Sequence, residues 1–538
     1  MKTNELSNEE IEIKNLDHLG IVAGIIDEIG IVEKINELLS TDSREKVNAG
    51  LVVKAIILNG LGFVSKPLYL FSQFFEDKAI EHLLGEGIKA ENLNDDKLGR
   101  VMDKLYKYGL TNLFLMIGLS VIKKYGISTK YSHLDSTSFH LHGKYNNRLD
   151  HDEKEIEILS DQPIVITHGY SRDHRPALKQ CILDLIVSSD GDIPLFFRGG
   201  DGNESDKAVF GKILVEYSKQ INVESILVAD SALYSENNLK LMSNLKWISR
   251  VPLTIKKAKS LVKKLTNVEF KRSEQKGYSY QEELVTYGGI EQRWILVKSE
   301  ERKKADLKKL SLKIQSESIK VKKQIAKLVK EEFDQSSSGM SKMKEIESKL
   351  KYHQITEVQI IQHQTKEQKV IYKVSGELIE SQELITENQN SSGRFILATN
   401  IWDMRDLDAS EILRVYKQQQ SCERGFRFLK DPLFFADSLF VKNPERVETM
   451  MMLMGLCLLV YNLGQRQLRK TLKAEKATIK NQINKLTERP TLRWIFQCFQ
   501  GIHVLIAQGV KRIINLSEQR HRILQFLPAS CQKYYFSG

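Results

Sequence analysis

Two aspartates close short apolar segments of the kind that form β-strands. Asp135 lies in HLDSTSF, and Asp230 ends ILVAD. In open α/β sheets, reactive groups gather at strand ends and in the loops that follow them. Two carboxylates brought together there repel each other, and a divalent cation that prefers hard oxygen ligands, Mg²⁺ or Mn²⁺, relieves the repulsion. Because aspartates also end strands simply as turn formers, a metal site needs a third ligand.

A third carboxylate lies far along the chain, in YKQQQSCERGFRFLKDPLFF, which begins at Tyr416. Helical spacing places it on one face with a phenol, an amide and two cations. These residues are Glu423, Tyr416, Gln419, Arg427 and Lys430. Cations beside a metal-binding carboxylate suit a substrate that brings negative charge, such as a phosphodiester. The alternative, which spacing alone favours, is that Glu423 pairs with Arg427 on a solvated face.

The segments around the two aspartates alternate between strand and helix patterns. YSHLDSTSF is followed by CILDLIVSS and IPLFFRG, which Asp190-Gly191-Asp192 joins as a hairpin. A helical pattern from Asp206, the strand ending at Asp230, a short helix and the strand KWISRVP come next. This order of strand, hairpin, helix, strand, helix and strand predicts a mixed α/β sheet.

A lysine-rich segment separates the second aspartate from Glu423. Apolar residues recur there every seven positions, which predicts a helical seam. They are Leu307, Ile314, Val321 and Leu328. QSSSG (335–339) predicts a break before a second helix, VQIIQHQ and KVIYKVS predict strands, and ENQNSSG predicts a loop. RFILATN then predicts a strand that returns to the core.

Helical patterns dominate both ends of the chain, and Met450 to Gly464 predicts a buried helix that is short for a bilayer span. We therefore predict four regions. They are a helical N-terminal domain (1–125), a core that holds the three carboxylates (126–252 and 394–445), an insertion (253–393) and a helical C-terminal region (446–538).

Composition sets few limits on function. The 538 residues carry a formal net charge of +11, which permits a polyanionic partner without requiring one. The five cysteines form no CxxC pair, so neither a disulfide framework nor a zinc knuckle is predicted. A polar N-terminus, unlike a signal peptide, predicts a cytoplasmic protein associated with the nucleoid and no membrane partner.

The motifs in order resemble the DDE transposases of bacterial insertion sequences, in the insertion-sequence-four superfamily. The stretch from Tyr416 fits that family's Y-x2-R-x3-E-x6-K signature, except that Gln419 stands at the arginine position. HLDSTSFHLHGKY, GYSRDHRPALKQ, RGGDGNESD and VADSALYS resemble the family's other core segments. The resemblance covers residues 131–462. The glutamine at position 419 argues against a phosphate-binding role for that position. Arg424 or Arg427 would then supply the phosphate-binding cation.

The resemblance implies an RNase H-like catalytic core interrupted by a large β-rich and helical insertion. It further implies that the N-terminal domain (1–125) recognises DNA ends and that the C-terminal region (446–538) takes part in dimerisation. It implies that Asp135, Asp230 and Glu423 are catalytic and bind two Mg²⁺ ions, for which Mn²⁺ substitutes. It also implies DNA contacts through Tyr416 and Lys430. Further candidates for DNA binding are Gln419, Arg427 and Arg175. Trp294 is a candidate for stacking on a flipped base, although packing in a small β core is the favoured interpretation of this tryptophan.

The activity implied is cut-and-paste transposition by a homodimer bound to double-stranded DNA. Cleavage at the element ends would release a 3′-OH, which then attacks target DNA, with a hairpin intermediate as one route. Two other functions stay open on the sequence alone. One is a protein that binds element ends without cleaving them, such as a repressor, and the other is an RNase H-like nuclease that never joins strands.

Overall fold

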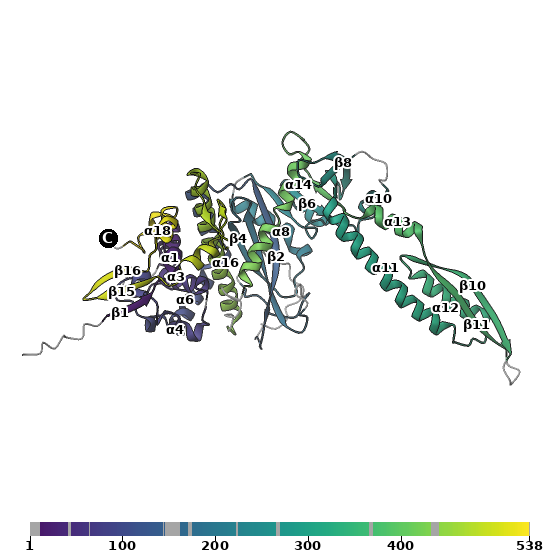
Figure 1. Ribbon diagram of the computed structural model, residues 1–538, viewed down its shortest axis with the longest axis horizontal. Coiled ribbons are helices and arrows are strands. Elements are labelled where there is room, and N and C mark those ends of the chain that lie inside the picture. Colours follow the sequence, from purple (N-terminus) through teal and green to yellow (C-terminus); the bar gives the residue numbers. More distant parts are fainter. Residues whose placement is uncertain are drawn as a thin grey trace, which may run out of the picture. The chain divides into compact units, whose positions relative to one another are not determined.

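The computed structural model describes residues 11–40, 45–63, 65–143, 145, 162–170, 175–221, 224–264, 270–364, 370–431 and 441–536. The chain divides into two compact units (Figure 1). Unit 1 consists of Met1–Trp247 and Val415–Gly538, and unit 2 of Ile248–Arg414. Unit 1 thus combines both helical ends of the chain with the strands around Asp135 and Asp230. Residues 171–174 of GYSRDHRPALKQ and residues 432–435 of the stretch from Tyr416 lie outside the described residues.

The N-terminal part of unit 1 is helical after one short strand, β1 (Glu12–Asn15). Its helices are α1 (Leu19–Ile29), α2 (Ile31–Leu38), α3 (Ala49–Leu61), α4 (Phe71–Phe75), α5 (Ile80–Leu84), α6 (Asp95–Tyr108) and α7 (Leu110–Tyr125), with short 3₁₀ turns at Leu68–Leu70 and Ala90–Leu93. Asn48 and Asn94 cap α3 and α6, because each side chain accepts a hydrogen bond from a backbone N–H in the first turn. Gly126 ends α7 in the left-handed conformation.

A mixed sheet holds both predicted aspartates. Its elements follow the predicted order: β2 (Tyr131–Leu141), β3 (Lys179–Ser188), β4 (Pro194–Gly200), α8 (Asp206–Ile221), β5 (Ile226–Ala229) and α9 (Glu236–Leu241). The strand order in unit 1 is β4-β3-β2-β5. The strand β2 is antiparallel to β3 and parallel to β5. The β3–β4 turn contains Gly191 and Asp192 with positive φ, as a tight hairpin requires.

The longest helix of unit 1 is α16 (Pro444–Ala474), which includes the predicted buried stretch. Asn443 caps it and Pro444 occupies its first turn. The helix packs against α3, α6, α7 and β4, and 94% of its most apolar window is buried, so the prediction of a core helix is confirmed (Figure 1). By length and composition alone it would also reach across a membrane.

The C-terminal elements of unit 1 return to the first ones. They are β13 (Ile479–Lys480), β14 (Leu486–Thr487), α17 (Leu492–Cys498), β15 (His503–Ala507), β16 (Val510–Ile514), α18 (Glu518–Gln525) and α19 (Ala529–Gln532). The strand β15 pairs with β1 on one side and β16 on the other. The helix α19 packs on α1, and Gly24 is required there because an added Cβ would lie 2.3 Å from the Cys531 backbone.

Unit 2 contains an antiparallel sheet and a helical hairpin. Its strands, in spatial order, are β6 (Lys246–Val251), β12 (Arg394–Thr399), β9 (Ile290–Ser299), β8 (Tyr278–Tyr287) and β7 (Lys271–Arg272). The predicted strands KWISRVP and RFILATN are therefore confirmed and pair with each other. Buried Arg293 connects this sheet to the following loop through the carbonyl oxygens of Ile401 and Leu407.

The predicted seam lies on α11 (Glu300–Leu328), which packs with α12 (Ser336–Ser348) against the hairpin of β10 (His353–Gln364) and β11 (Val370–Glu380) (Figure 1). Val321 and Leu328 are buried in this core, whereas Leu307 and Ile314 are only half-buried. The predicted break at QSSSG is wrong, because the serines begin α12 and the break precedes them.

Two other local predictions are wrong. ENQNSSG is not a loop, because most of it lies in α13 (Gln382–Ser391), which follows a single turn-forming serine. The stripe from Tyr416 to Lys430 is not one helix either. The chain forms α14 (Ala409–Lys417), a turn at Gln418 and Gln419, and α15 (Gln420–Leu429). The remaining helix is the short α10 (Lys256–Lys264), which follows β6.

Candidate active site

The two predicted aspartates occupy equivalent positions on neighbouring parallel strands. Leu134 of β2 lies opposite Ala229 of β5; Asp135 is the next residue within β2, and Asp230 directly follows the end of β5. Adjacent strands are about 4.8 Å apart, and residues in the same register point to the same face of a sheet. Asp135 and Asp230 therefore lie side by side on one face, and both side chains are half-exposed.

Helices cover the two faces of β2 differently. On one face, the Ser132 hydroxyl lies 3.1 Å from the Tyr217 hydroxyl of α8. On the other face, which carries the odd-numbered residues His133 and Asp135, α15 packs against the strand. The polar residues of SHLDSTS therefore alternate between the face covered by α8 and the face covered by α15, and Asp135 lies on the α15 face.

Gln419 attaches the start of α15 to β2 next to Asp135. Its side-chain amide Nε2–H donates to the Leu134 carbonyl over 2.6 Å, and its Oε1 lies 3.1 Å from Nδ1 of His133. The Cys422 thiol adds a contact of 3.3 Å to the His133 carbonyl. Gln419 is 8% exposed, so these bonds form away from water, where a buried polar group needs its partner.

Burial and charge set the protonation of this contact region. Burial lowers the pKa of His133 to about 4, so the imidazole is neutral at pH 7 and its Nδ1 interacts with an amide and not with an acid. Burial raises the pKa of the Cys422 thiol, and the nearby carboxylates of Asp135 and Glu423 add to that effect.

Glu423 lies on the side of α15 that faces β2. At 100° per residue, Gln419, Glu423 and Lys430 fall within about 40° of one another around the helix. Gln419 contacts β2 at Leu134, and the Lys430 ammonium lies 5.8 Å from the ring centre of Phe139 further along the strand. Glu423 is exposed between these two contacts. The alternative interpretation required an ion pair between Glu423 and Arg427. Within the part of the chain that the structure describes, no such ion pair is formed.

The three carboxylates suit a hard divalent cation by their chemistry, although their side chains do not converge on one point in this structure. Three carboxylates supply only oxygen atoms, which Mg²⁺ and Mn²⁺ prefer. Asp135 and Asp230 each accept a hydrogen bond from a backbone N–H at one oxygen, over 2.9 and 2.8 Å, which orients the carboxylates. Among the described residues, no three acidic, histidine or cysteine side chains are close enough together to hold a metal ion.

The other predicted DNA-binding residues lie on different elements and differ in exposure. Arg427 is exposed on α15, and half-buried Tyr416 lies in the last turn of α14. Arg424 forms an ion pair of 2.7 Å with Asp192 of the β3–β4 turn. Arg175 is exposed in the loop before β3.

Trp294 has no exposed surface and donates its indole N–H to Gln292 over 3.2 Å. It lies on β9 in unit 2. Stacking on a flipped base needs an accessible ring face, so this placement favours packing inside the sheet.

A buried charge network supports the opposite face of the sheet and was missed by sequence reasoning. Asp184 on β3 lies opposite Ser136 of β2 and Arg198 of β4, and it bonds to both side chains. Arg198 also binds Glu204 through two bonds of 2.9 Å. The available signal was an acid within apolar CILDLIVSS and a base within the adjoining IPLFFRG.

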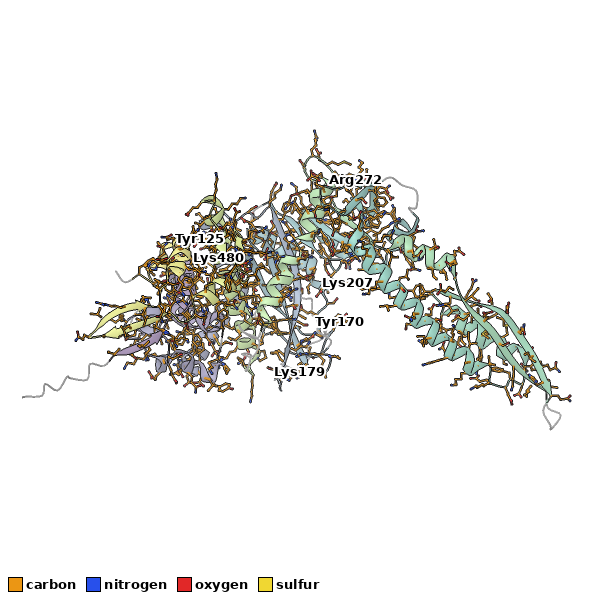
Figure 2. The ribbon with its side chains drawn as sticks, viewed as in Figure 1. Tyr125, Tyr170, Lys179, Lys207, Arg272 and Lys480 are labelled. Atoms are coloured by element: carbon orange, nitrogen blue, oxygen red, sulfur yellow. The ribbon has the colours of Figure 1, made fainter. Side chains whose placement is uncertain are left out.

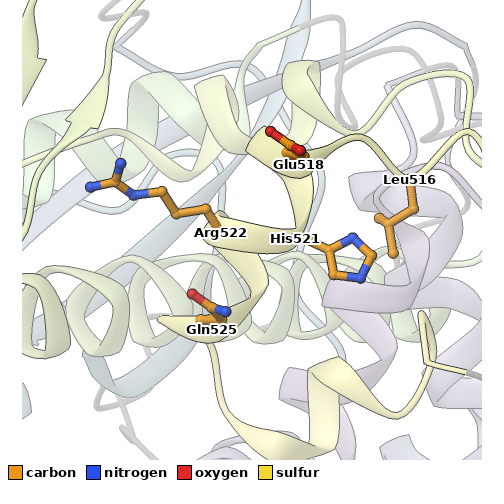
Figure 3. Close-up of a pocket in the computed structure, with 5 residues that line it drawn as sticks. All are labelled: Leu516, Glu518, His521, Arg522 and Gln525. Atoms are coloured by element: carbon orange, nitrogen blue, oxygen red, sulfur yellow. The ribbon is translucent and has the colours of Figure 1, made fainter.

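A surface hollow of about 550 Å³ lies elsewhere, along α18 (Figure 3). It is lined by Leu516, Glu518, His521, Arg522 and Gln525. Four of these residues belong to α18 and Leu516 lies two residues before it, so none of the predicted carboxylates takes part. Its mixed charge points to no particular ligand.

Comparison with known proteins identifies the family. Residues 132–463 match the family described as "Transposase DDE domain", which covers more than half of the chain and includes all three candidate carboxylates. The chain belongs to the DDE transposases. Residues 11–119 of this transposase match "Domain of unknown function (DUF4277)". The predicted DDE transposase family is therefore confirmed, while the superfamily and the signature type stay predictions.

Other comparisons add less. A search of curated proteins finds no match to this transposase. Among solved structures, it is similar to the piggyBac transposase synaptic complex with hairpin DNA, at 11% sequence identity and a TM-score of 0.38, over 95% of this chain and 84% of that chain.

Proposed function

We propose that this protein is a cut-and-paste DNA transposase with an RNase H-like core, in which Asp135, Asp230 and Glu423 are the catalytic residues. The observation that carries the proposal is the register of β2 and β5, which sets the two aspartates side by side. The attachment of α15 to the same face of β2 supports the assignment of Glu423 as the third residue.

The three carboxylates would hold the divalent cations, Mg²⁺ or Mn²⁺. When bound, such ions activate water and stabilise the leaving 3′ oxygen of a phosphodiester. The protein contributes the positions of the ligands. The two aspartates are oriented by backbone N–H groups, and Glu423 is presented by a helix that Gln419 and Cys422 attach to β2.

Cations near this face would bind the DNA backbone. Lys430 lies beside Phe139 on the same side of α15 as Glu423, and Arg427 is exposed one turn after Glu423. Tyr416 precedes the turn that orients Gln419. We assign these three residues to phosphate contacts near the scissile bond, with double-stranded DNA as substrate and target and a homodimer as the active form.

Metal-dependent cleavage tests the assignment. Purified full-length protein is incubated with Mg²⁺ or Mn²⁺ and a duplex that carries one end of the inserted element, and nicked strands are measured. We expect Asp135→Asn, Asp230→Asn and Glu423→Gln each to lower the cleavage rate roughly a thousand-fold, a change of about 4 kcal/mol in the barrier, while end binding changes less than about three-fold. Glu236→Gln on exposed α9 is the matched control. Normal nicking by any of the three variants would refute the assignment.

A second assay separates transposition from the other functions. Ends cut in advance to expose the 3′-OH are mixed with circular target DNA, and joined products are measured. Joining that requires all three carboxylates supports transposition. Cleavage without joining would identify a nuclease, and end binding without cleavage in Mn²⁺ would identify a repressor.

A further inference from the structure

Positive charge is concentrated in one segment of unit 1. From Arg466 to Arg493 there are nine Lys and Arg and two acidic residues, a net charge of +7 within 28 residues. The whole chain of 538 residues carries +11. The mild overall excess therefore conceals a strongly basic region at the end of α16 and in the β13–β14 hairpin that follows it.

This region folds against α15. Arg469 on α16 donates its Nε–H to the Pro490 carbonyl over 2.9 Å, which fixes Arg469 next to the residue that follows Arg489, and the charge of Arg489 acts on it. Arg424 of α15, the residue after Glu423, also lies within electrostatic reach of Arg469. Lys480 projects from β13 in the same segment (Figure 2).

Acidic partners neutralise only some of these cations. Arg466 binds Asp190 over 2.6 Å and Arg493 binds Asp431 over 2.7 Å. Among the described residues, Arg469 and Arg489 have no acidic partner within ion-pair distance. We name these two residues the arginine pair.

The arginine pair has features of an anion site. Burial and the charge of Arg489 lower the pKa of Arg469, so the two guanidinium groups destabilise each other. The Pro490 carbonyl occupies only one of the five N–H donors of Arg469 and fixes the plane of the others. Guanidinium groups held in this way suit bidentate binding of phosphate, which would also relieve the repulsion.

We propose that Arg469 and Arg489 bind backbone phosphates of the duplex that lies along α15, next to the point of cleavage. The inference rests on the proposed function, because DNA is the polyanion that Glu423 on α15 would act upon. It adds a second set of phosphate contacts, supplied by α16 and the segment after β14, to those assigned to Arg427 and Lys430.

The test is the salt dependence of DNA binding by the full-length protein without divalent metal. The probe is a 40-base-pair duplex with one element end, and a duplex of unrelated sequence is measured beside it. Each lost phosphate contact lowers the slope of log K against log salt by about 0.9. We expect the double variant Arg469→Ala/Arg489→Ala to lose about 1.8 from the slope and to bind both duplexes roughly 10- to 100-fold more weakly.

The controls separate this contact from general charge. Lys123→Ala/Lys240→Ala removes two exposed charges from α7 and α9 of the same unit, and we expect little change in slope. Arg469→Lys/Arg489→Lys retains the charge and is expected to restore most of the slope. A slope for the alanine variant equal to that of the Lys123/Lys240 control would overturn the inference.

The outcome does not depend on catalysis. If Asp135→Asn cleaves normally while the alanine variant loses slope, the catalytic assignment fails and the arginine pair stands. If Asp135→Asn is inactive while the alanine variant keeps the wild-type salt slope, the catalytic assignment stands and the arginine pair fails.

Discussion

Replacing Gln419 tests whether this position anchors α15 or contacts DNA, because the family signature has arginine there. In Gln419→Leu the side chain keeps a similar volume but loses its bonds to His133 and Leu134. A buried polar group left without its partner costs about 1–3 kcal/mol, so two such groups cost about 2–6 kcal/mol. The added apolar burial returns about 1–2 kcal/mol, so the middle of each range leaves a loss of about 2.5 kcal/mol in the free energy of unfolding.

That loss converts into a measurable shift of the melting temperature. Unfolding entropy scales with length, and for a unit of roughly 370 residues 1 kcal/mol corresponds to about 1.3 °C. We therefore expect differential scanning calorimetry to show a decrease of about 3 °C in the melting temperature of unit 1. A cycle with His133→Leu isolates the bond, since the two substitutions together should cost at least about 1 kcal/mol less than their sum.

Catalysis should be affected more than binding. Misplacement of a catalytic group by 1 Å can cost about 100-fold in rate. Gln419→Leu should therefore lower the cleavage rate by roughly that factor while end affinity stays within about three-fold. Gln419→Arg, which restores the signature residue, should be still less stable, because it places a charge at a position that is 8% exposed. An arginine variant with unchanged melting temperature and tighter DNA binding would refute the anchor and assign the position to phosphate binding.

Three further predictions concern unit 1. Burial lowers the pKa of His18 to about 4 from 6.5. Between these values the unfolded chain binds more protons, so stability falls as pH decreases from about 6.5 to 4, and His18 contributes about 3 kcal/mol of that fall. His18→Gln should remove this contribution, as measured by urea titrations at pH 7 and pH 4.5. Gly24→Ala should destabilise the α1–α19 contact by about 1–3 kcal/mol, because the new methyl meets the Cys531 backbone and not a movable side chain. Asp184→Asn should cost about 3–5 kcal/mol by leaving the buried Arg198 charge with a weaker partner, measured by chemical denaturation.

Each of these measurements has an internal control. Glu448, whose pKa burial raises to about 7, acts in the opposite sense to His18 as pH falls, so the two proteins must be compared at each pH. An unchanged pH dependence after His18→Gln would contradict its assignment. For Asp184→Asn, the control is Glu224→Gln in an exposed pair with Lys246, which should cost less than about 1 kcal/mol.

The sequence predicted the sheet because its signals are local. Apolar runs and the Asp190-Gly191-Asp192 turn define β2 to β6 in order, and the three carboxylates were found from motifs. Register cannot be read from such runs, so the side-by-side placement of Asp135 and Asp230 became known only from the pairing of β2 with β5.

Contacts between residues far apart in the sequence, polar in one case and apolar in the other, explain the predictions that failed. A regular stripe suggested one helix through Gln419, yet the turn there lets its amide reach His133 and Leu134, about 285 residues away. Serines in QSSSG resemble a linker locally, but apolar residues further on, such as Met343, hold that segment as a helix against Val374. Local propensity is a weak guide where tertiary packing decides.

The pairing of the first and last elements of unit 1 has a consequence for biosynthesis. The surface of α1 around Gly24 is covered by Cys531 and Tyr535, and β1 is completed by β15. The ribosome makes the covering segment roughly 500 residues later, which at ordinary translation speeds is a delay of about 25–100 s. During that interval the nascent α1 exposes apolar surface that chaperones or a second growing chain can bind. Messages cut short before codon 500 should therefore yield protein that is degraded, even though every catalytic carboxylate has already been translated.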